Sequence, residues 1–273
     1  MLKIIRKTML PKPFYWLVTG LLLGLTGIGC NTRIEGCLQA NAENFDLNAE
    51  RPCDGCCLYP SMGLSLTQKW GDRNFSNGDT LYDVQGNPYK ILDLKYFLSS
   101  WVWRDTEGNY ITVDSVEAGC DESTLRFTTD NLIMDSRQFV YTLGTIRESP
   151  LIDSLQLALG LYQDFSCLDT SDTDTPVSLT NQSPLWNVKT GTLETIRLIL
   201  QLNLDQEATD TLFVTTNDFI RLEYLLQLKP GTDAQLDLTV DYSQWFSNVN
   251  VNDLNSFGHS IETNFAGSVI RTP

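Results

Sequence analysis

Apolar and polar residues alternate along most of residues 61–273, as they do in strands that bury one face. The clearest stretch is 193–204, in which leucine and isoleucine recur at every second position after one early slip. A second stretch, 89–103, is rich in aromatic and branched residues, which favour strands. The other expected strands are 63–70, 110–116, 126–128, 139–143, 155–161, 211–214, 220–228 and 234–240.

Many short strands separated by turn-forming residues are typical of an all-β domain. The pattern therefore predicts an antiparallel β-sandwich, jelly-roll or immunoglobulin-like, over residues 61–273. A short helical turn is expected at 241–246 and a polar loop at 169–184, and no amphipathic helix of any length is expected. The turn signals lie at 86–88, 107–109 and 229–231.

The first 29 residues have the features of an export signal. Four basic residues and no acidic ones precede an apolar run of twelve residues at 14–25, which is short for a spanning helix that needs about 20. Gly29-Cys30 follows, and a small residue before cysteine is what a lipoprotein signal peptidase accepts. We expect cleavage before Cys30 and a lipid on that residue. The lipid would anchor the protein to the cell envelope, at the periplasmic or the surface leaflet of the outer membrane. The alternative is a membrane anchor that is never cleaved.

The cysteines that follow Cys30 are even in number, and an exported protein meets oxidising conditions, so up to three disulfides are expected. Their clustering predicts that the four cysteines between 37 and 57 pair among themselves, and that Cys120 pairs with Cys167. The alternative is a zinc or copper(I) thiolate site at the Cys-Asp-Gly-Cys-Cys run. The six cysteines are Cys37, Cys53, Cys56, Cys57, Cys120 and Cys167.

A small cysteine-rich module is expected at residues 30–60. Its core, 36–59, resembles a short module of exported bacterial proteins, roughly G-C-T-D-P-x-A-x-N-Y-D-P-x-A followed by D-G-S-C and an aromatic residue. A disulfide would replace the hydrophobic core that so few residues cannot build. We interpret the module as a disulfide-cross-linked spacer between the lipid and the domain. Calcium binding is the alternative, but Gln39 stands where the motif has a carboxylate that could be a ligand. The matching residues are Gly36, Cys37, Ala42, Asn44, Phe45, Asp46, Ala49, Asp54, Gly55, Cys56 and Tyr59.

Charge and composition exclude several classes of function. With 34 acidic and 19 basic residues the net charge is −15, so a nucleic-acid partner is not expected. One histidine rules out sites that need two imidazoles, and the common hydrolase and phosphate-binding motifs are missing. We expect a protein that is not an enzyme; a hydrolase with paired carboxylates is the remaining enzymatic alternative, because acidic residues are abundant.

Several segments in order resemble the MbnP-like family, whose members are exported proteins associated with methanobactin. The opening segment is Tyr82, the run YKILDLKYFLSSW at 89–101, and the motif Asp105-Thr-Glu-Gly108. LQLALGL at 155–161, LDLTVDYSQWF at 236–246 and Asn-Phe-Ala at 264–266 are similar to later markers of that family. The resemblance implies an exported, mostly β protein, with an outer-membrane receptor or a di-haem protein as partner.

The resemblance also raises the question of copper, which some relatives bind through histidines and an oxidised tryptophan. The family's tryptophan-rich stretch aligns on 184–192, where Trp186 and Gly191 match and the methionine, second tryptophan and tyrosine do not. His259 is the only imidazole, and one imidazole cannot form the multi-nitrogen site that copper(II) prefers. Trp186 and His259 are therefore the copper candidates. The alternatives are that Trp186 packs in the core or at its rim and that His259 lies in a solvated loop.

Two further tryptophans offer a different function. Trp101 and Trp103 lie two residues apart, on one face of the expected strand. If exposed they would stack on a sugar ring, and if buried they belong to the core. The sequence thus favours an exported, lipid-anchored, non-enzymatic binding or accessory protein of the MbnP-like type, with a surface carbohydrate-binding lipoprotein as the alternative.

Overall fold

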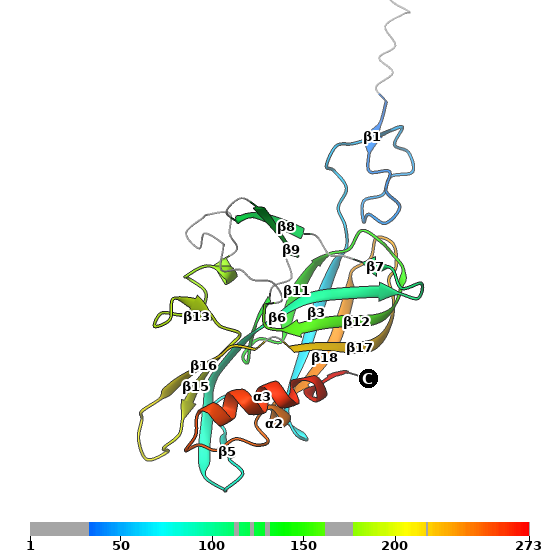
Figure 1. Ribbon diagram of the computed structural model, residues 1–273. Helices are drawn as coiled ribbons and strands as arrows, with labels where there is room; N and C mark the ends of the chain where they lie inside the picture. The colour runs from blue at the N-terminus through cyan, green and yellow to red at the C-terminus, as the bar shows by residue number, and fades with distance from the viewer. Residues whose placement is uncertain are drawn as a thin grey trace, which may run out of the picture.

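The computed structural model describes residues 33–111, 115–120, 123–128, 132–161, 177–216 and 218–272. Across these ranges the chain is mostly β-structure, with two large sheets, a C-terminal helix and a small N-terminal module at one end (Figure 1). No helix in them is long and apolar enough to cross a membrane.

The larger sheet has eight strands and is centred on β6 (Pro88–Asp105). Its main order is β16-β15-β6-β12-β17, and β5, β7 and β10 also pair with β6. Every ladder in this sheet is antiparallel, as predicted. The partners are β5 (Thr80–Tyr82), β7 (Tyr110–Ile111), β10 (Leu132–Asp135), β12 (Leu151–Leu159), β15 (Ile196–Gln201), β16 (Asp210–Val214) and β17 (Asp218–Gln227).

The smaller sheet has five strands in the order β11-β3-β18-β19, with β4 beside β3. Its central pair, β3 and β18, is parallel, so the prediction of a wholly antiparallel fold is wrong here. A parallel pair needs a long connection, and most of the chain lies between these two strands. The strands are β3 (Ser61–Trp70), β4 (Arg73–Asn74), β11 (Val140–Thr145), β18 (Ala234–Asp241) and β19 (Val269–Arg271).

Both sheets bury their apolar positions in one shared core. Along β3 the buried side chains are Met62, Leu64 and Leu66, and the register places Leu64 opposite Leu236 of β18. Residues of β6, β12, β15 and β17 complete the same cluster. Each fully buried leucine contributes about 1.5–3 kcal/mol relative to exposure, so this alternation determines which way the strands face.

Strand β6 departs from simple alternation at two bulges. Its core-facing residues change from odd to even numbers between Ile91 and Leu94, and back to odd between Leu98 and Trp101. The second change occurs at Ser100, whose φ of 57° is in the left-handed region. Each bulge adds one residue to one strand and reverses the faces of all residues beyond it.

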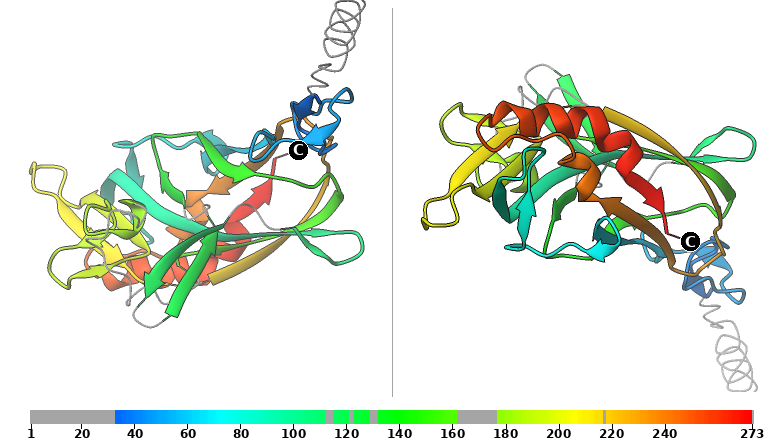
Figure 2. Two further views of the ribbon diagram at one scale, coloured as in Figure 1. Left: turned by 90° about the horizontal axis from the view of Figure 1, so that it is seen from above. Right: turned by 90° about the horizontal axis from the view of Figure 1, so that it is seen from below.

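Two helical segments lie beside the smaller sheet. The predicted turn at 241–246 contains α2 (Tyr242–Trp245), which Asp241 caps by accepting from the Ser243 amide. Helix α3 (Asn255–Ser268) was not predicted; it packs against α2, β17, β18 and β19 (Figure 2). Its apolar residues Phe257, Ile261 and Phe265 recur every fourth position and are buried. Serine, asparagine, glycine and threonine occupy many of the positions between them. Because these residues are weak helix formers, the sequence does not indicate a helix despite the helical spacing of the apolar residues.

The remaining elements are short. A hairpin of β13 and β14 follows the 3-10 helix η1, and together they occupy part of the expected polar loop and its continuation. Leu179 and Leu185 from this region cover Phe97 on the outer face of β6, forming a second apolar cluster. The elements are β8 (Ser115–Cys120), β9 (Ser123–Thr128), η1 (Val177–Leu179), β13 (Trp186–Asn187), β14 (Thr192–Leu193) and, in the N-terminal module, β1 (Glu35–Gly36) and β2 (Arg51–Pro52).

Candidate functional site

The N-terminal module, residues 33–60, gathers four cysteines. Cys37 is bonded to Cys57 and Cys53 to Cys56, so these four pair among themselves. The sulfur atoms of Cys53, Cys56 and Cys57 lie within 4.8 Å of one another. Cys30 and Cys167 lie outside the described residues, so lipidation and the link from Cys120 stay predictions.

Hydrogen bonds hold the cysteine-bearing segments of the module. Asn44 donates from Nδ2 to the Cys56 carbonyl at 2.8 Å and accepts from the Leu58 amide at 2.8 Å. The Asp46 amide donates to the Cys37 carbonyl at 2.8 Å, and its carboxylate accepts from the Asn48 amide. The polar residues of the motif thus order a segment that lacks an apolar core.

No group of three converging carboxylates supports the calcium alternative in the described residues. In the described part of the chain, the three cysteines form the only group of three or more histidine, cysteine, aspartate or glutamate residues whose ligand atoms converge. One oxygen of Asp46 is already an acceptor in a turn. Calcium takes six to eight oxygen ligands, among which backbone carbonyls can be several, so calcium binding stays a prediction.

The module is attached to the β body, residues 61–272, through Asn41. Its Nδ2 donates to the Arg147 carbonyl at 3.0 Å, its Oδ1 accepts from the Ser149 hydroxyl at 3.0 Å, and its carbonyl accepts from the Gly231 amide at 3.2 Å. The Arg147 guanidinium lies 4.8 Å above the centre of the Tyr59 ring. Sequence reasoning missed Asn41, because its partners are more than a hundred residues away.

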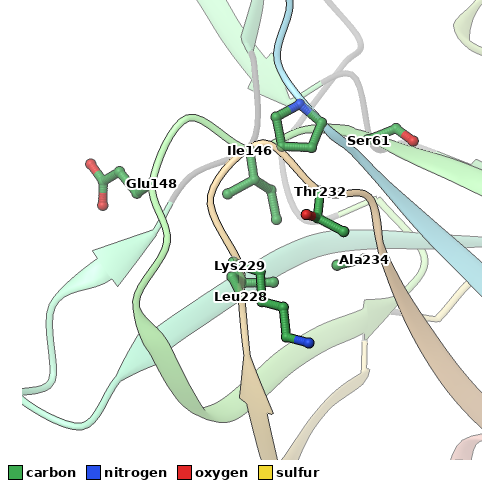
Figure 3. Close-up of a pocket in the computed structure, with 8 residues that line it drawn as sticks. Ser61, Ile146, Glu148, Leu228, Lys229, Thr232 and Ala234 are labelled. Atoms are coloured by element: carbon green, nitrogen blue, oxygen red, sulfur yellow. The ribbon is translucent and has the colours of Figure 1, made fainter. Parts of the chain in front are cut away.

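A small hollow lies where the module meets the body (Figure 3). Its volume is about 10 Å³, roughly the space of one water molecule. A sugar or other organic ligand does not fit in it. The lining residues are Pro60, Ser61, Ile146, Glu148, Leu228, Lys229, Thr232 and Ala234.

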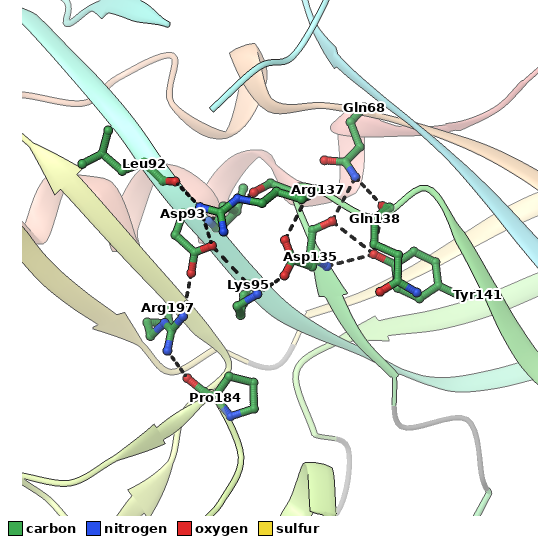
Figure 4. A network of polar contacts seen from close by, with 12 residues as sticks. Gln68, Leu92, Asp93, Lys95, Asp135, Arg137, Gln138, Tyr141, Pro184 and Arg197 are labelled. Carbon is green, nitrogen blue, oxygen red and sulfur yellow. Dashed lines mark hydrogen bonds and ion pairs between the residues drawn. The ribbon is translucent and has the colours of Figure 1, made fainter. Parts of the chain in front are cut away.

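A charged network crosses the outer face of the larger sheet around buried Asp93 (Figure 4). Asp93 lies 2.6 Å from an Arg197 nitrogen, 3.5 Å from Arg137 and 3.9 Å from Lys95, which also pairs with Asp135. Burial lowers the pKa of Lys95; Asp93 opposes this shift and the two arginines add to it. Each carboxylate faces a cation, and the Arg137 and Arg197 guanidiniums also donate to the Leu92 and Pro184 carbonyls. We interpret the network as a clamp between β6 and its neighbours.

Trp101 and Trp103 are buried, with 1% and 0% of their surface exposed. Trp101 donates from its indole nitrogen to the Leu98 carbonyl at 3.3 Å. Both side chains belong to the shared core, because the bulge at Ser100 turns their face inward. The proposed stacking on sugar is therefore wrong for these residues.

The two copper candidates lie on different elements. Trp186 is half-buried in the β13–β14 hairpin. His259 is exposed on α3, not in a loop as expected, and its carbonyl accepts from the Thr263 hydroxyl. Within the described residues, no hydrogen bond, ion pair or ring contact joins the two side chains. With one imidazole and no second nitrogen ligand nearby, these residues do not fit a copper site.

Comparisons with known proteins give one distant similarity. No protein-family model matches the chain, and no curated protein matches it. Among solved structures, MbnP from Methylosinus trichosporium is similar at 10% sequence identity and a TM-score of 0.39, over 70% of this chain and 79% of that one. This is a structural similarity to a protein of the family that the sequence resembles, and at this distance it supports no statement about ligand or activity.

Proposed function

We propose that the protein is an exported, lipid-anchored binding or accessory protein of the MbnP-like type that catalyses no reaction. In this proposal the lipid is attached to Cys30, the N-terminal module is a cross-linked spacer, and the β body contacts a partner. The observation that carries it is the position of the module: two disulfides follow the expected lipidation site and precede the body directly.

The contacts of the module support a spacer. The Cys37–Cys57 bond closes a loop with a sequence separation of 20 residues. In the loop-entropy description such a bond is worth about 3 kcal/mol, which offsets the missing core. The three hydrogen bonds of Asn41 hold the body at a defined position relative to the module.

The partner in this proposal is another envelope protein, either an outer-membrane receptor or a di-haem protein. We further propose that the two sheets are the two layers of the predicted sandwich, because their buried side chains form one core. The carbohydrate alternative loses support at Trp101 and Trp103, because both are buried, and would depend on the half-buried Trp186.

The test is metabolic labelling of the full chain with a palmitate analogue in a bacterium that processes lipoproteins. We expect label and membrane fractionation for the wild type and for Cys167→Ser. Cys30→Ser should lose the label, because only Cys30 follows the signal, although its uncleaved apolar leader can still hold it at the membrane. Membrane association without label in the wild type would instead identify an uncleaved anchor. A protein that is neither labelled nor associated with membranes would overturn the proposal.

A further inference from the structure

Three of the four sulfur atoms in the module lie together, and the fourth, that of Cys37, is bonded to one of them. Cys57 is bonded to Cys37, and its sulfur also lies within 4.8 Å of the Cys53 and Cys56 sulfurs. Cys53, Cys56 and Cys57 are partly exposed, whereas Cys37 is buried. We propose that, once both disulfides are reduced, these four cysteines bind one zinc ion.

Four thiolates in one place are the ligand set of structural zinc sites. With Zn–S bonds of about 2.3 Å, tetrahedral geometry requires sulfur atoms about 3.8 Å apart. The sulfur of Cys57 lies within 4.8 Å of the bonded Cys53 and Cys56 sulfurs, so reduction, which separates the two bonded pairs, would leave the thiols to rearrange over distances of this order. The Cys53-Asp-Gly-Cys56 turn suits such a site, because Gly55 has a φ of 67° and reverses the chain between two ligands.

The backbone holds these cysteines by contacts that do not depend on the disulfides. Asn44 connects the carbonyl of Cys56 with the amide of Leu58, on either side of Cys57. The Cys53 amide donates to the Gly36 carbonyl at 3.1 Å, beside Cys37. These hydrogen bonds limit the separation of the thiols after reduction, and bound zinc would replace the cross-links that reduction removes.

The chemistry balances with a dithiol as the reductant. Each dithiol gives two electrons and two protons to one protein disulfide and becomes a cyclic disulfide, so two dithiols produce four cysteine thiols. Zinc binding then displaces four protons, because the thiolate is the ligand. Disulfide and zinc forms exclude each other, so the module is either oxidised and stapled or reduced and metal-bound.

The experiment uses the purified full chain in detergent. The protein is reduced with a dithiol, freed of reductant without oxygen, mixed with Zn²⁺ and a chromophoric chelator, and analysed for bound metal. We expect one zinc ion per chain after reduction and none in the oxidised protein. Cys53→Ser/Cys56→Ser should lose the zinc, and the matched control Cys120→Ser/Cys167→Ser should keep it.

Two further readouts keep the result decisive. Alkylation and mass spectrometry should show Cys37, Cys53, Cys56 and Cys57 protected by zinc, and circular dichroism should show an intact β body in both variants. The proposal is overturned if the reduced wild type binds no zinc, if Cys53→Ser/Cys56→Ser binds as much as the wild type, or if the control variant loses the metal. None of these outcomes depends on lipidation, so they are independent of the proposed function.

Discussion

The β body and the N-terminal module are ordered by different forces. The body buries its aromatic and aliphatic side chains in a core shared by two sheets. Between residues 33 and 59 the only buried apolar side chains are Cys37 and Ala42. Five large apolar side chains of this short segment are exposed instead: Ile34, Leu38, Phe45, Leu47 and Leu58.

This difference follows from size. A segment of fewer than thirty residues cannot remove enough apolar surface from water to offset its conformational entropy. Covalent links and hydrogen bonds from asparagine and aspartate take the place of a core. Damage to the core should therefore unfold the body, whereas damage to the links should release the module alone.

The largest effect is expected from Trp245→Ala in the body. Trp245 is fully buried, its ring lies 4.9 Å from that of Tyr96 and 5.7 Å from that of Phe265, and its indole nitrogen donates to Ser268. We expect a loss of about 3–5 kcal/mol in the free energy of unfolding, measured by urea denaturation. The control Val188→Ala, at a side chain that is 85% exposed, should change it by less than about 0.5 kcal/mol. Equal effects of the two substitutions would contradict the assigned core.

Cys37→Ser/Cys57→Ser should have the next largest effect, confined to the module. Removal of this bond should destabilise the module by about 3 kcal/mol, and proteolysis between residues 33 and 60 should increase. The melting temperature of the body should not change. Cys53→Ser/Cys56→Ser opens a loop of sequence separation 3 and should have a smaller effect. If removal of the Cys37–Cys57 bond lowered the melting temperature of the body, the module and the body would not be independently stable regions.

Gly231→Ala tests the junction between the two regions. Gly231 has a φ of 62°, and an added Cβ would lie 3.0 Å from the Ala42 carbonyl oxygen of the module. Gly191→Ala is the matched control, since Gly191 has a φ of 70° with open space around it. The conformational cost of about 1–2 kcal/mol should appear in both variants. Only Gly231→Ala should in addition increase proteolysis of the module, and the same proteolysis in both variants would exclude the predicted steric contact.

Acid should produce the smallest effect, again at the junction. Hydrogen bonds from the Ser61 amide and hydroxyl lower the pKa of exposed Asp233, and burial opposes them only in part. Its carboxylate therefore stabilises the fold above the ordinary pKa of 3.8, and this contribution is lost as the pH falls through the lower pKa of the folded state.

Asp233 also interacts with Glu43 of the module, so we expect the module to become more sensitive to an acid protease as the pH falls below the ordinary pKa of 3.8. Asp233→Asn should weaken that dependence. Asp241→Asn is the control within the body. Burial raises the pKa of Asp241, but hydrogen bonds from Gly71 and Ser243 outweigh it and place the pKa below its usual value. That control should leave the release of the module unchanged, and an equal response would show that acid acts on the whole fold.

The fold was predictable where apolar residues followed a simple period. Strands β3, β6, β15 and β18 were expected within a few residues of their observed bounds, because two-residue alternation is a local property. Helix α3 was missed, although Phe257, Ile261 and Phe265 recur at helical spacing, because the expectation rested on the polar residues between them. The parallel pairing of β3 and β18 has no local signal.

The candidate site was predictable in part for the same reason. The cysteine spacing and the Asn44 and Asp46 pattern are local, so the cross-linked module could be expected from 36–59 alone. The hydrogen bonds of Asn41 to Arg147, Ser149 and Gly231 join segments that are distant in the sequence, so they could not be predicted from it. The separation of Trp186 from His259 likewise depends on where β13 and α3 lie.

The sequence by itself determined the strand-rich body, the clustered cysteines and the scarcity of nitrogen ligands, because composition and short periods carry that information. Only the tertiary structure decided which face of β6 is buried. A single extra residue at Ser100 reverses every side chain beyond it, so Trp101 and Trp103 point into the core. The partner strand that accommodates this bulge, β12, comes some fifty residues later in the chain, which is why local alternation could not reveal it.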